Sequence, residues 1–510
     1  MKQFNRAGPC LPARHYMLKP EDRLPGVRER IEAGEFFSIC GPRLSGRTTL
    51  VRSLAANLNR TRKFAAVVVS LESFTRPAVE IAVPQILQTV AERAEDALPL
   101  KSQPPDAVPF LGSPDIGLRR YLSAWAKSTK RRVVLFLDEF DMMPAELQTA
   151  VLRQLREGYM SRPAPFAHSV ALVGRDDMPL RWHGLAGTTP VNLAAGAAIL
   201  RNFTAREVIE LCKQHTDETG QRFVAEAAAQ IHEYTRGQPW LVNALAGMAA
   251  KEFASGRHKI NAADVDEARD LMLHRQEGHL WCLARALDEE PVRRILEPIL
   301  VGAPAFQPSF EADFARARAL GLVEESEDGG AAMANPIYAE FVPRALVRRL
   351  RVLFSQEVEN YTEPGARLDL AEVLRAFQSF WRRRGEAAAS ALPYPEAAPH
   401  LILFGFLQQI GEQGGCVEPD FSTGAGRTEF LIRWPDGDGE QLELVELMIR
   451  REPKHPLLAA LGEPAQHLER LGLEQSFVVI FDFRSEVGGE EKIFQKTIKR
   501  DGKTFNIFGV

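Results

Sequence analysis

The segment from residue 41 to residue 49 reads GPRLSGRTT, and these residue types in this order could bind phosphate. Gly41, Gly46 and Thr48 match the phosphate-loop pattern G-x-x-x-x-G-K-[ST], in which glycines let backbone N–H groups face the phosphates. The threonine hydroxyl of such a loop ligates Mg²⁺, and the start of the following helix attracts anions. The pattern therefore predicts a site for ATP and Mg²⁺. Four more residues would line it: Pro42, Arg43, Ser45 and Thr49.

The loop departs from the pattern at one position, where Arg47 replaces the expected lysine. Lysine is a compact point charge, whereas arginine is longer and planar, so the two are not interchangeable at a tight site. Arg47 could neutralise phosphate and still place its charge poorly for phosphoryl transfer. We therefore expect ATP binding with slow or impaired hydrolysis.

Two acidic residues end the hydrophobic run VVLFLDEFD, residues 133–141. Asp138 is expected to hold Mg²⁺ together with Thr48, and Glu139 to polarise the attacking water. Acidic residues after a buried strand can also serve only to keep the following loop in contact with solvent. Their combination with an upstream phosphate loop favours the catalytic interpretation.

A second polar strand end follows the run SVALVG, residues 169–174. Arg175 and Asp176 come directly after it, at the strand end where open α/β sheets bind their ligands. Arg175 is therefore a candidate sensor of the γ-phosphate. The alternative is an ordinary surface arginine.

These residues need a parallel sheet to bring them together. Short continuous apolar runs, typical of buried parallel strands, occur at FFSIC (36–40), AAVVVSL (65–71), VVLFLD (133–138) and SVALVG (169–174). The chain then becomes helical, and Thr204 stands three residues before Glu207, as in a helix-capping box. The fold class is therefore α/β, with a P-loop parallel sheet followed by a helical lid.

The length of 510 residues suggests three or four domains. Two helices and a hairpin with an Asp-Gly-Gly turn, between residues 286 and 350, suggest a winged helix. The expected parts are a phosphate-loop core (1–200), a helical lid (201–285), a winged helix (286–365), an amphipathic helix with a small-residue linker (366–392) and a C-terminal α/β domain (393–510).

The N-terminal half resembles bacterial AAA-like ATPases related to the STAND and origin-recognition clade. The likeness lies in FNRAGPC…HYMLKPEDRLPGVRERIEAGEFFSICGPRLSGRTT, in the Walker B-like VVLFLDEFD and in the sensor-like LVGRDD, and it covers roughly residues 4–350. The resemblance implies that residues 15–23 contribute to the adenine side. It also implies that Gly237 and Pro239 face the nucleotide at the start of a lid helix, where local reading finds a turn and a proline-assisted helix start.

The last part, residues 393–510, resembles the PD-(D/E)XK nuclease fold and the C-terminal domain that often follows this ATPase. The resemblance implies that Glu429 and Glu446 are the metal-holding carboxylates, with Glu418 as a further acidic member. Met448 stands at the lysine position and cannot polarise water. The domain is therefore expected to be degenerate.

An active nuclease would need a cation from elsewhere in this domain. Arg450 and Lys454 are the nearest candidates in the sequence. Nothing in the sequence places either of them beside the carboxylates.

The charge balance excludes a strongly polybasic protein. Lysine and arginine number 63 and aspartate and glutamate 67, which gives a net charge of −4 and leaves room only for local basic patches. Two clusters occur, at Arg344, Arg348, Arg349 and Arg351 and at Arg382–Arg384. Such clusters are usually solvated helix faces, and the alternative is DNA contact through the winged helix and the C-terminal domain.

The cysteines and the apolar runs bear on the compartment. Five scattered cysteines form no metal-ligand spacing, so we expect reduced thiols. No run approaches the ~18 apolar residues of a membrane helix, and the N-terminus lacks the hydrophobic core of a signal peptide. We expect a cytoplasmic protein without a membrane partner. The AAA-like resemblance also implies a homo-oligomer.

Three functional hypotheses follow. The first is an ATP-dependent switch that hydrolyses slowly and controls a degenerate nuclease-like domain. The second is an ATPase-coupled, metal-dependent DNA nuclease. The third is a scaffold that binds DNA or protein and has lost both activities.

Overall fold

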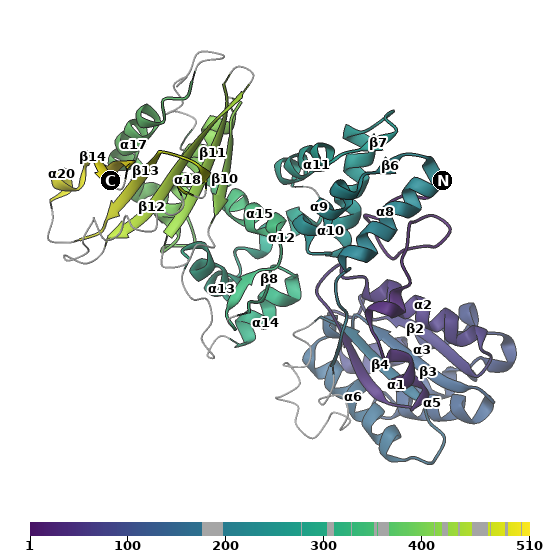
Figure 1. Ribbon diagram of the computed structural model, residues 1–510. Helices are drawn as coiled ribbons and strands as arrows, with labels where there is room; N and C mark the ends of the chain where they lie inside the picture. The colour runs from purple at the N-terminus through teal and green to yellow at the C-terminus, as the bar shows by residue number, and fades with distance from the viewer. Residues whose placement is uncertain are drawn as a thin grey trace. The chain divides into compact units, whose positions relative to one another are not determined.

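The computed structural model describes most of the chain, namely residues 1–175, 197–276, 278–302, 311–327, 329–350, 354, 367–412, 414–420, 427–436, 439–450, 468–469, 471–484, 488–500 and 502–510. Two compact units account for it: Met1–Leu271 with Arg318–Gly321, and Met272–Ala317 with Leu322–Val510 (Figure 1). Within these described ranges, no helix has the length and apolar character that a membrane crossing requires.

The first unit contains a five-stranded parallel sheet of order β2-β3-β4-β1-β5. Its strands are β1 Phe36–Cys40, β2 Phe64–Ser70, β3 Arg132–Asp138, β4 Ser169–Gly174 and β5 Ala197–Ile199. The four strands predicted from apolar runs are confirmed. The short β5 was not predicted, because its apolar run is too short to indicate a strand by itself.

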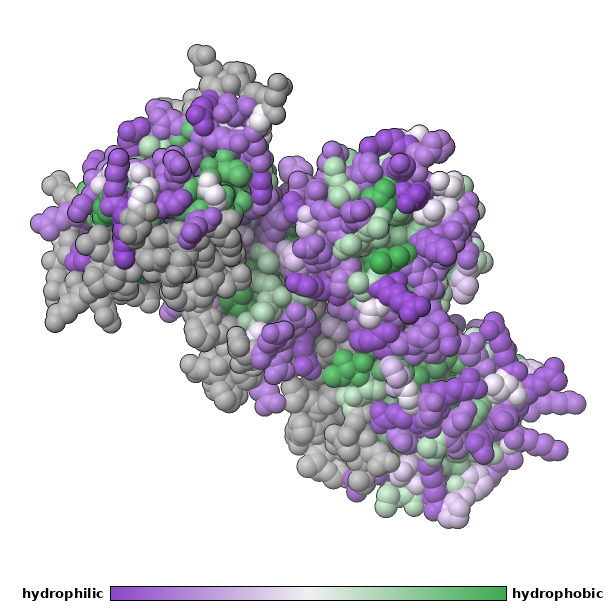
Figure 2. Space-filling view, viewed as in Figure 1, coloured by the Kyte–Doolittle hydropathy of each residue, from purple (hydrophilic) through white to green (hydrophobic). Residues whose placement is uncertain are grey.

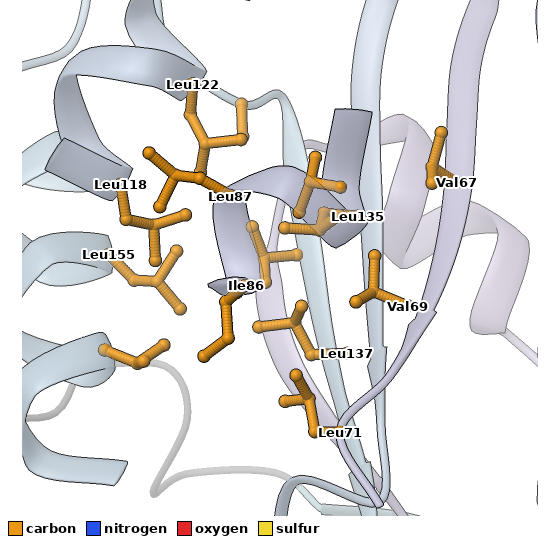
Figure 3. Packing of buried hydrophobic residues seen from close by; sticks show 14 of the residues in the cluster. Val67, Val69, Leu71, Ile86, Leu87, Leu118, Leu122, Leu135, Leu137 and Leu155 are labelled. Atoms are coloured by element: carbon orange, nitrogen blue, oxygen red, sulfur yellow. The ribbon is translucent and has the colours of Figure 1, made fainter. Parts of the chain in front are cut away.

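Helices cover both faces of this sheet. Those of the first unit up to residue 160 are η1 Pro20–Arg23, α1 Val27–Glu32, α2 Arg47–Arg60, α3 Val79–Ala97, η2 Leu100–Ser102, α4 Val108–Leu111, α5 Gly117–Ser128, η3 Phe140–Met142 and α6 Ala145–Met160. Residues 37, 39, 66, 134 and 136 face α1 and α2, whereas their strand neighbours face α3, α5 and α6. Figure 3 shows Val69 and Leu137 pointing toward Ile86 of α3. This alternation places every strand between two apolar layers, as a buried parallel sheet requires.

The helical region follows the sheet. It consists of α8 Ala205–Thr219, β6 Arg222–Phe223, α9 Ala225–Thr235, α10 Pro239–Met248, the π-helical turn η5 Ala249–Phe253, β7 Lys259–Ile260 and α11 Ala262–Arg275. The predicted capping box of α8 is confirmed, since Glu207 N–H donates to Thr204 Oγ1 and Thr204 N–H donates to the Glu207 carboxylate. Arg201 also binds this carboxylate and lowers the pKa of Glu207 to about 2.

Helices and then a hairpin follow, in the order predicted for a winged helix. The elements are α12 His279–Ala286, α13 Glu290–Leu300, α14 Glu311–Leu320, β8 Val323–Glu325, β9 Ala331–Met333, α15 Pro336–Val347 and η7 Arg348–Leu350. β8 and β9 pair antiparallel. Asn335 caps α15 by accepting a hydrogen bond from Tyr338 N–H.

A mixed six-stranded sheet of order β10-β11-β12-β13-β15-β14 forms the C-terminal part of the second unit. Its elements are α17 Leu370–Ser390, α18 Ala398–Glu412, β10 Cys416–Asp420, β11 Arg427–Asp436, β12 Gly439–Arg450, β13 Gln475–Asp482, α20 Gly489–Lys492, β14 Phe494–Arg500 and β15 Lys503–Gly509. The prediction of a small-residue linker after the amphipathic helix is wrong. α17 continues through GEAAAS because alanine is the strongest helix former.

Candidate nucleotide site

The phosphate loop, residues 41–49, connects β1 to α2. Its geometry favours glycine at position 46 and leaves little room for a side chain at position 41. Gly46 has φ +92°, in the left-handed region, and a Cβ on Gly41 would lie 2.7 Å from Ser45 Oγ. α2 begins at Arg47, so its free N–H groups point into the loop. The predicted loop therefore has the backbone of an anion site.

The predicted metal pair is in direct contact. Thr48 Oγ1 donates a 2.7 Å hydrogen bond to Asp138 Oδ2 at the end of β3. Asp138 is 3% exposed, and burial raises the pKa of its carboxyl above the ordinary value. The Thr48 hydrogen bond and the charge of Arg47 partly oppose this rise in the pKa. A buried carboxylate beside a hydroxyl offers two oxygen ligands of the kind that Mg²⁺ prefers.

Glu139 follows Asp138 in a left-handed conformation, with φ +58°. This backbone turns the chain sharply at the end of β3, and both Asp138 and Glu139 line the cavity beside the phosphate loop. Burial raises the pKa of Glu139, and the nearby Glu72 raises it further. Arg47 acts against both effects on the pKa.

Arg47, the first residue of α2, is close enough to Asp138 and Glu139 for its charge to act on both. Its Nη1 is buried and has no hydrogen-bond partner among the described residues, and the same holds for Ser45 Oγ. A buried guanidinium nitrogen without an acceptor is costly unless a ligand supplies one. Of the two, only Arg47 also lines the neighbouring cavity, so its Nη1 fits a phosphate group that would accept from it.

A cavity of about 1260 Å³ opens at the loop. Of the residues predicted to contact nucleotide, those that line it are Arg43, Gly46, Arg47, Thr48, Thr49, Asp138, Glu139 and Pro239. Gly41, Pro42, Ser45, Arg175 and Gly237 do not line it. Gly237 instead packs against the chain before α8, where a Cβ would overlap the carbonyl oxygen of Phe203. Its φ of +71° also requires glycine.

An N-terminal segment lines the cavity, but it is not residues 15–23, which the resemblance assigned to the adenine side. Residues 5–10 line the cavity together with Trp240 and Asn243 of α10, which they contact. Cys10 N–H donates to Thr49 Oγ1 at 3.0 Å, and Asn5 N–H donates to Asn243 Oδ1 at 3.0 Å. The segment FNRAGPC was part of the AAA-like resemblance, but its local pattern gave no sign of these contacts.

Residues 15–23 lie outside the cavity lining. Their most buried cation is Arg23, whose guanidinium donates to the carbonyl of Arg201 and stacks on the ring of Phe203 at 4.7 Å. Burial lowers the pKa of Arg23 to about 10. This arginine therefore connects η1 to the chain that enters the helical region.

Arg175, the candidate sensor of the γ-phosphate, is partly buried and is paired with an acid. Its Nε donates at 2.5 Å to Asp141 Oδ2, and the Asp141 side chain is 2% exposed. The pair links the end of β4 to η3, which follows Glu139. Asp176 lies outside the described residues.

The C-terminal acidic residues are brought together only in part. In the register of β11 and β12, Glu429 lies directly opposite Glu446, and Asp420 of β10 lies opposite Glu429. Asp420, which the sequence did not single out, therefore shares this row of the sheet. Glu418 lies two pairs away, opposite Leu431, and Arg433 Nε donates to it at 3.3 Å.

Met448 packs against the apolar cluster beneath this sheet, which contains Leu444, Ile480 and Phe505. Neither proposed replacement cation is shown to reach the row. Arg450 lies 3.9 Å from Asp482, which Arg484 also binds, and Lys454 is outside the described residues. In the part of the chain that is described, no three histidines, cysteines or acids gather as a metal site.

The basic clusters hold internal contacts. Arg344 pairs with Glu340, and Arg348 donates to Gln276 at 3.3 Å. Arg383 donates to the Ser379 carbonyl at 3.2 Å. Arg351 lies outside the described residues. These contacts are those of ordinary helix surfaces, and they give no support to a DNA-binding patch.

No family model and no curated protein matches the chain. Solved structures similar to it include the Walker-type ATPase paby2304 of Pyrococcus abyssi, at 14% identity over 66% of this chain and 99% of that one, with a TM-score of 0.48. They also include the Aeropyrum pernix ORC2 protein, at 14% identity over 64% and 91% with a TM-score of 0.44, and the Thermotoga maritima RuvB branch migration motor, at 17% over 62% and 92% with 0.35. Likenesses of this degree decide neither activity nor partner.

Proposed function

We propose that the chain is a P-loop ATP-binding protein of the AAA-like kind, in which Arg47 slows hydrolysis. The observation that carries this proposal is the 2.7 Å hydrogen bond from Thr48 to Asp138, at the mouth of a glycine-rich loop. It joins the two side chains that the sequence assigns to Mg²⁺ at this loop. The buried, unpartnered Nη1 of Arg47, considered among the described residues, supports a phosphate beside them.

ATP with Mg²⁺ would supply a γ-phosphoryl group open to attack by water. The N–H groups at the start of α2 would hold the phosphates, and Thr48 and Asp138 would hold the metal. Arg47 would neutralise phosphate charge. Glu139 would orient the water and accept its proton, and its raised pKa makes it a stronger base than an ordinary glutamate.

We further propose that the nuclease-like C-terminal domain is a non-catalytic module that responds to the nucleotide. The support is the packing of Met448 against the apolar cluster, so that this position supplies no cation to the acidic row. A charged lysine at this position would have to leave an apolar environment. A switch therefore fits better than an ATPase-coupled nuclease.

Asp138→Asn is expected to abolish the effect of Mg²⁺ on ATP affinity while ATP still binds. Asparagine keeps an acceptor for the Thr48 hydroxyl but removes the charge that holds the metal. Calorimetric titration with ATP, with and without Mg²⁺, measures both quantities. Asp141→Asn is the matched control outside the metal pair, since Asp141 binds Arg175 instead. Equal Mg²⁺ effects in wild type and Asp138→Asn would refute the metal assignment.

The raised pKa of Asp138 adds a pH dependence. Because burial favours the protonated acid, the metal-free fold is stabilised at low pH, and this contribution is lost as pH rises through the raised pKa. Mg²⁺ needs the ionised form. The Mg²⁺ effect on ATP affinity should therefore begin to fail, on acidification, at a pH above 3.8, the ordinary value for this carboxyl. Asp138→Asn should show no such transition.

A further inference from the structure

The cavity does not end at the phosphate loop. It continues along β2, between α2 and the end of α3, in a channel that we call the β2 groove. Its floor is formed by Ala66, Val68 and Ser70, and small side chains of Ala55, Ala56 and Ala97 form its walls. The whole cavity of about 1260 Å³ exceeds the 300–1,000 Å³ of ordinary small-molecule pockets. The β2 groove is therefore open to a second occupant beside a nucleotide.

The floor is an open sheet edge. β2 is the end strand of its sheet and pairs with β3 alone among the described strands. Ala66 N–H donates to Asn59 Oδ1 at 2.8 Å, and its carbonyl accepts from Asn59 Nδ2 at 2.9 Å, so both groups point away from β3. Alternate residues of a strand point their backbone groups the same way. The N–H and C=O groups of Val68 and Ser70 therefore also face the groove.

The Asn59 side chain makes the two hydrogen bonds with the Ala66 backbone that a neighbouring strand would otherwise make. In the described part of the chain, no side chain makes this double contact with Val68 or Ser70. An open edge with unpaired N–H and C=O groups is a template for another chain. The space for such a chain begins beyond Asn59 and runs toward the phosphate loop.

The charge of the groove selects the occupant. Five arginines line it: Arg52, Arg60, Arg62, Arg93 and Arg131. Two acids oppose them, of which Asp96 pairs with Arg93 at 3.5 Å and Glu72 lies at the phosphate-loop end. Figure 2 shows the surface over α2, β2 and α3 as largely hydrophilic. The excess of arginine favours an acidic partner.

We propose that the β2 groove binds an acidic, extended polypeptide segment of a partner protein. The segment adds a strand to the edge of β2 through backbone hydrogen bonds to Val68 and Ser70, and its carboxylates face the arginines. A nucleic acid is a poorer fit, because single strands are held by aromatic stacking and no aromatic residue lines this part of the cavity in the described chain. The groove adjoins the nucleotide site, but its proposed occupant does not require ATP.

The test is fluorescence anisotropy with the full chain and a short labelled peptide of alternating glutamate and valine, without ATP. We expect saturable binding of this peptide, and none of the alternating lysine–valine peptide. Val68→Pro should weaken binding about fivefold to tenfold, because it removes one backbone donor without breaking a bond to β3. Val68→Ala, which keeps the donor, is its control. Circular dichroism establishes that each variant is folded.

A second pair of variants serves if Val68→Pro does not fold. These variants are Arg60→Glu and Lys63→Glu. Arg60 lines the groove, whereas Lys63 is exposed and lies outside the cavity lining. Only Arg60→Glu should therefore weaken binding of the peptide. No binding of the acidic peptide, or equal losses within each pair, would overturn the proposal. Preference for a single-stranded oligonucleotide over the acidic peptide would overturn it in favour of nucleic acid. Failure of ATP binding with intact peptide binding would refute the nucleotide site alone.

Discussion

Arg47→Lys is expected to raise Mg²⁺-dependent ATP hydrolysis by at least about tenfold, with ATP affinity changed by no more than about threefold. The arginine fits the site as a phosphate-neutralising group, since its buried Nη1 has no acceptor among the described residues. Its planar fork, however, is longer than the lysine that such loops use. Lysine would place a compact charge at the β- and γ-phosphates, where charge develops during transfer.

The matched control for this gain is Arg52→Lys. Arg52 lies on α2 and also lines the cavity, but it is outside the phosphate loop. It should leave the rate of hydrolysis unchanged. Steady-state phosphate release with purified full-length protein measures both variants. If neither variant hydrolyses ATP faster than wild type although ATP binds tightly, then Glu139 or the Thr48–Asp138 pair does not support catalysis. This result would favour the scaffold hypothesis.

Gly237→Ala is expected to destabilise the first unit by about 2–4 kcal/mol, combining left-handed backbone strain with a steric overlap. The glycine has φ +71°, and a Cβ would overlap the carbonyl of Phe203. Phe203 N–H donates to the Gly237 carbonyl at 2.9 Å, so the two backbones are held together and cannot separate freely. ATP affinity should fall as well, because Pro239 and Trp240 line the cavity immediately after this turn.

Gly220→Ala separates strain from overlap. Gly220 has φ +75°, but a Cβ there would meet nothing within 4 Å. It should therefore carry only the backbone penalty of about 1 kcal/mol. Differential scanning calorimetry of the two variants gives the comparison. Equal losses of stability would show that the overlap with Phe203 is relieved by small movements.

The phosphate loop and its acidic partner could be predicted because their signals are local. Gly46, Thr48 and Asp138 each stand at a strand or helix end that the apolar pattern already indicates. Parallel strands bring their carboxyl ends to one edge, so the Thr48–Asp138 contact follows from the order of elements. The capping box at Thr204 was predictable for the same reason.

Contacts between distant segments could not be predicted in this way. Cys10 contacts Thr49, and Asn5 contacts Asn243, although these residues are far apart in the sequence. Hydrophobic periodicity does not indicate contacts of this kind. The Asp141–Arg175 pair likewise depends on how two strand ends meet. No local pattern around Arg175 indicates this partner.

The C-terminal domain shows a third kind of limit. The strands from β10 to β13 were predicted, yet the register that sets Asp420 opposite Glu429 depends on an antiparallel pairing that the sequence leaves open. Small residues after Arg384 suggested a linker, whereas their alanines extend α17. Composition alone did not distinguish these two outcomes.

Calorimetric titration of the wild-type chain with ATP, in the presence and absence of Mg²⁺, tests the central claim most directly. We expect saturable binding at one site, strengthened by Mg²⁺, because Thr48 and Asp138 meet beside the unpartnered guanidinium nitrogen of Arg47 in the described chain. Absence of binding up to millimolar ATP, with or without Mg²⁺, would contradict it.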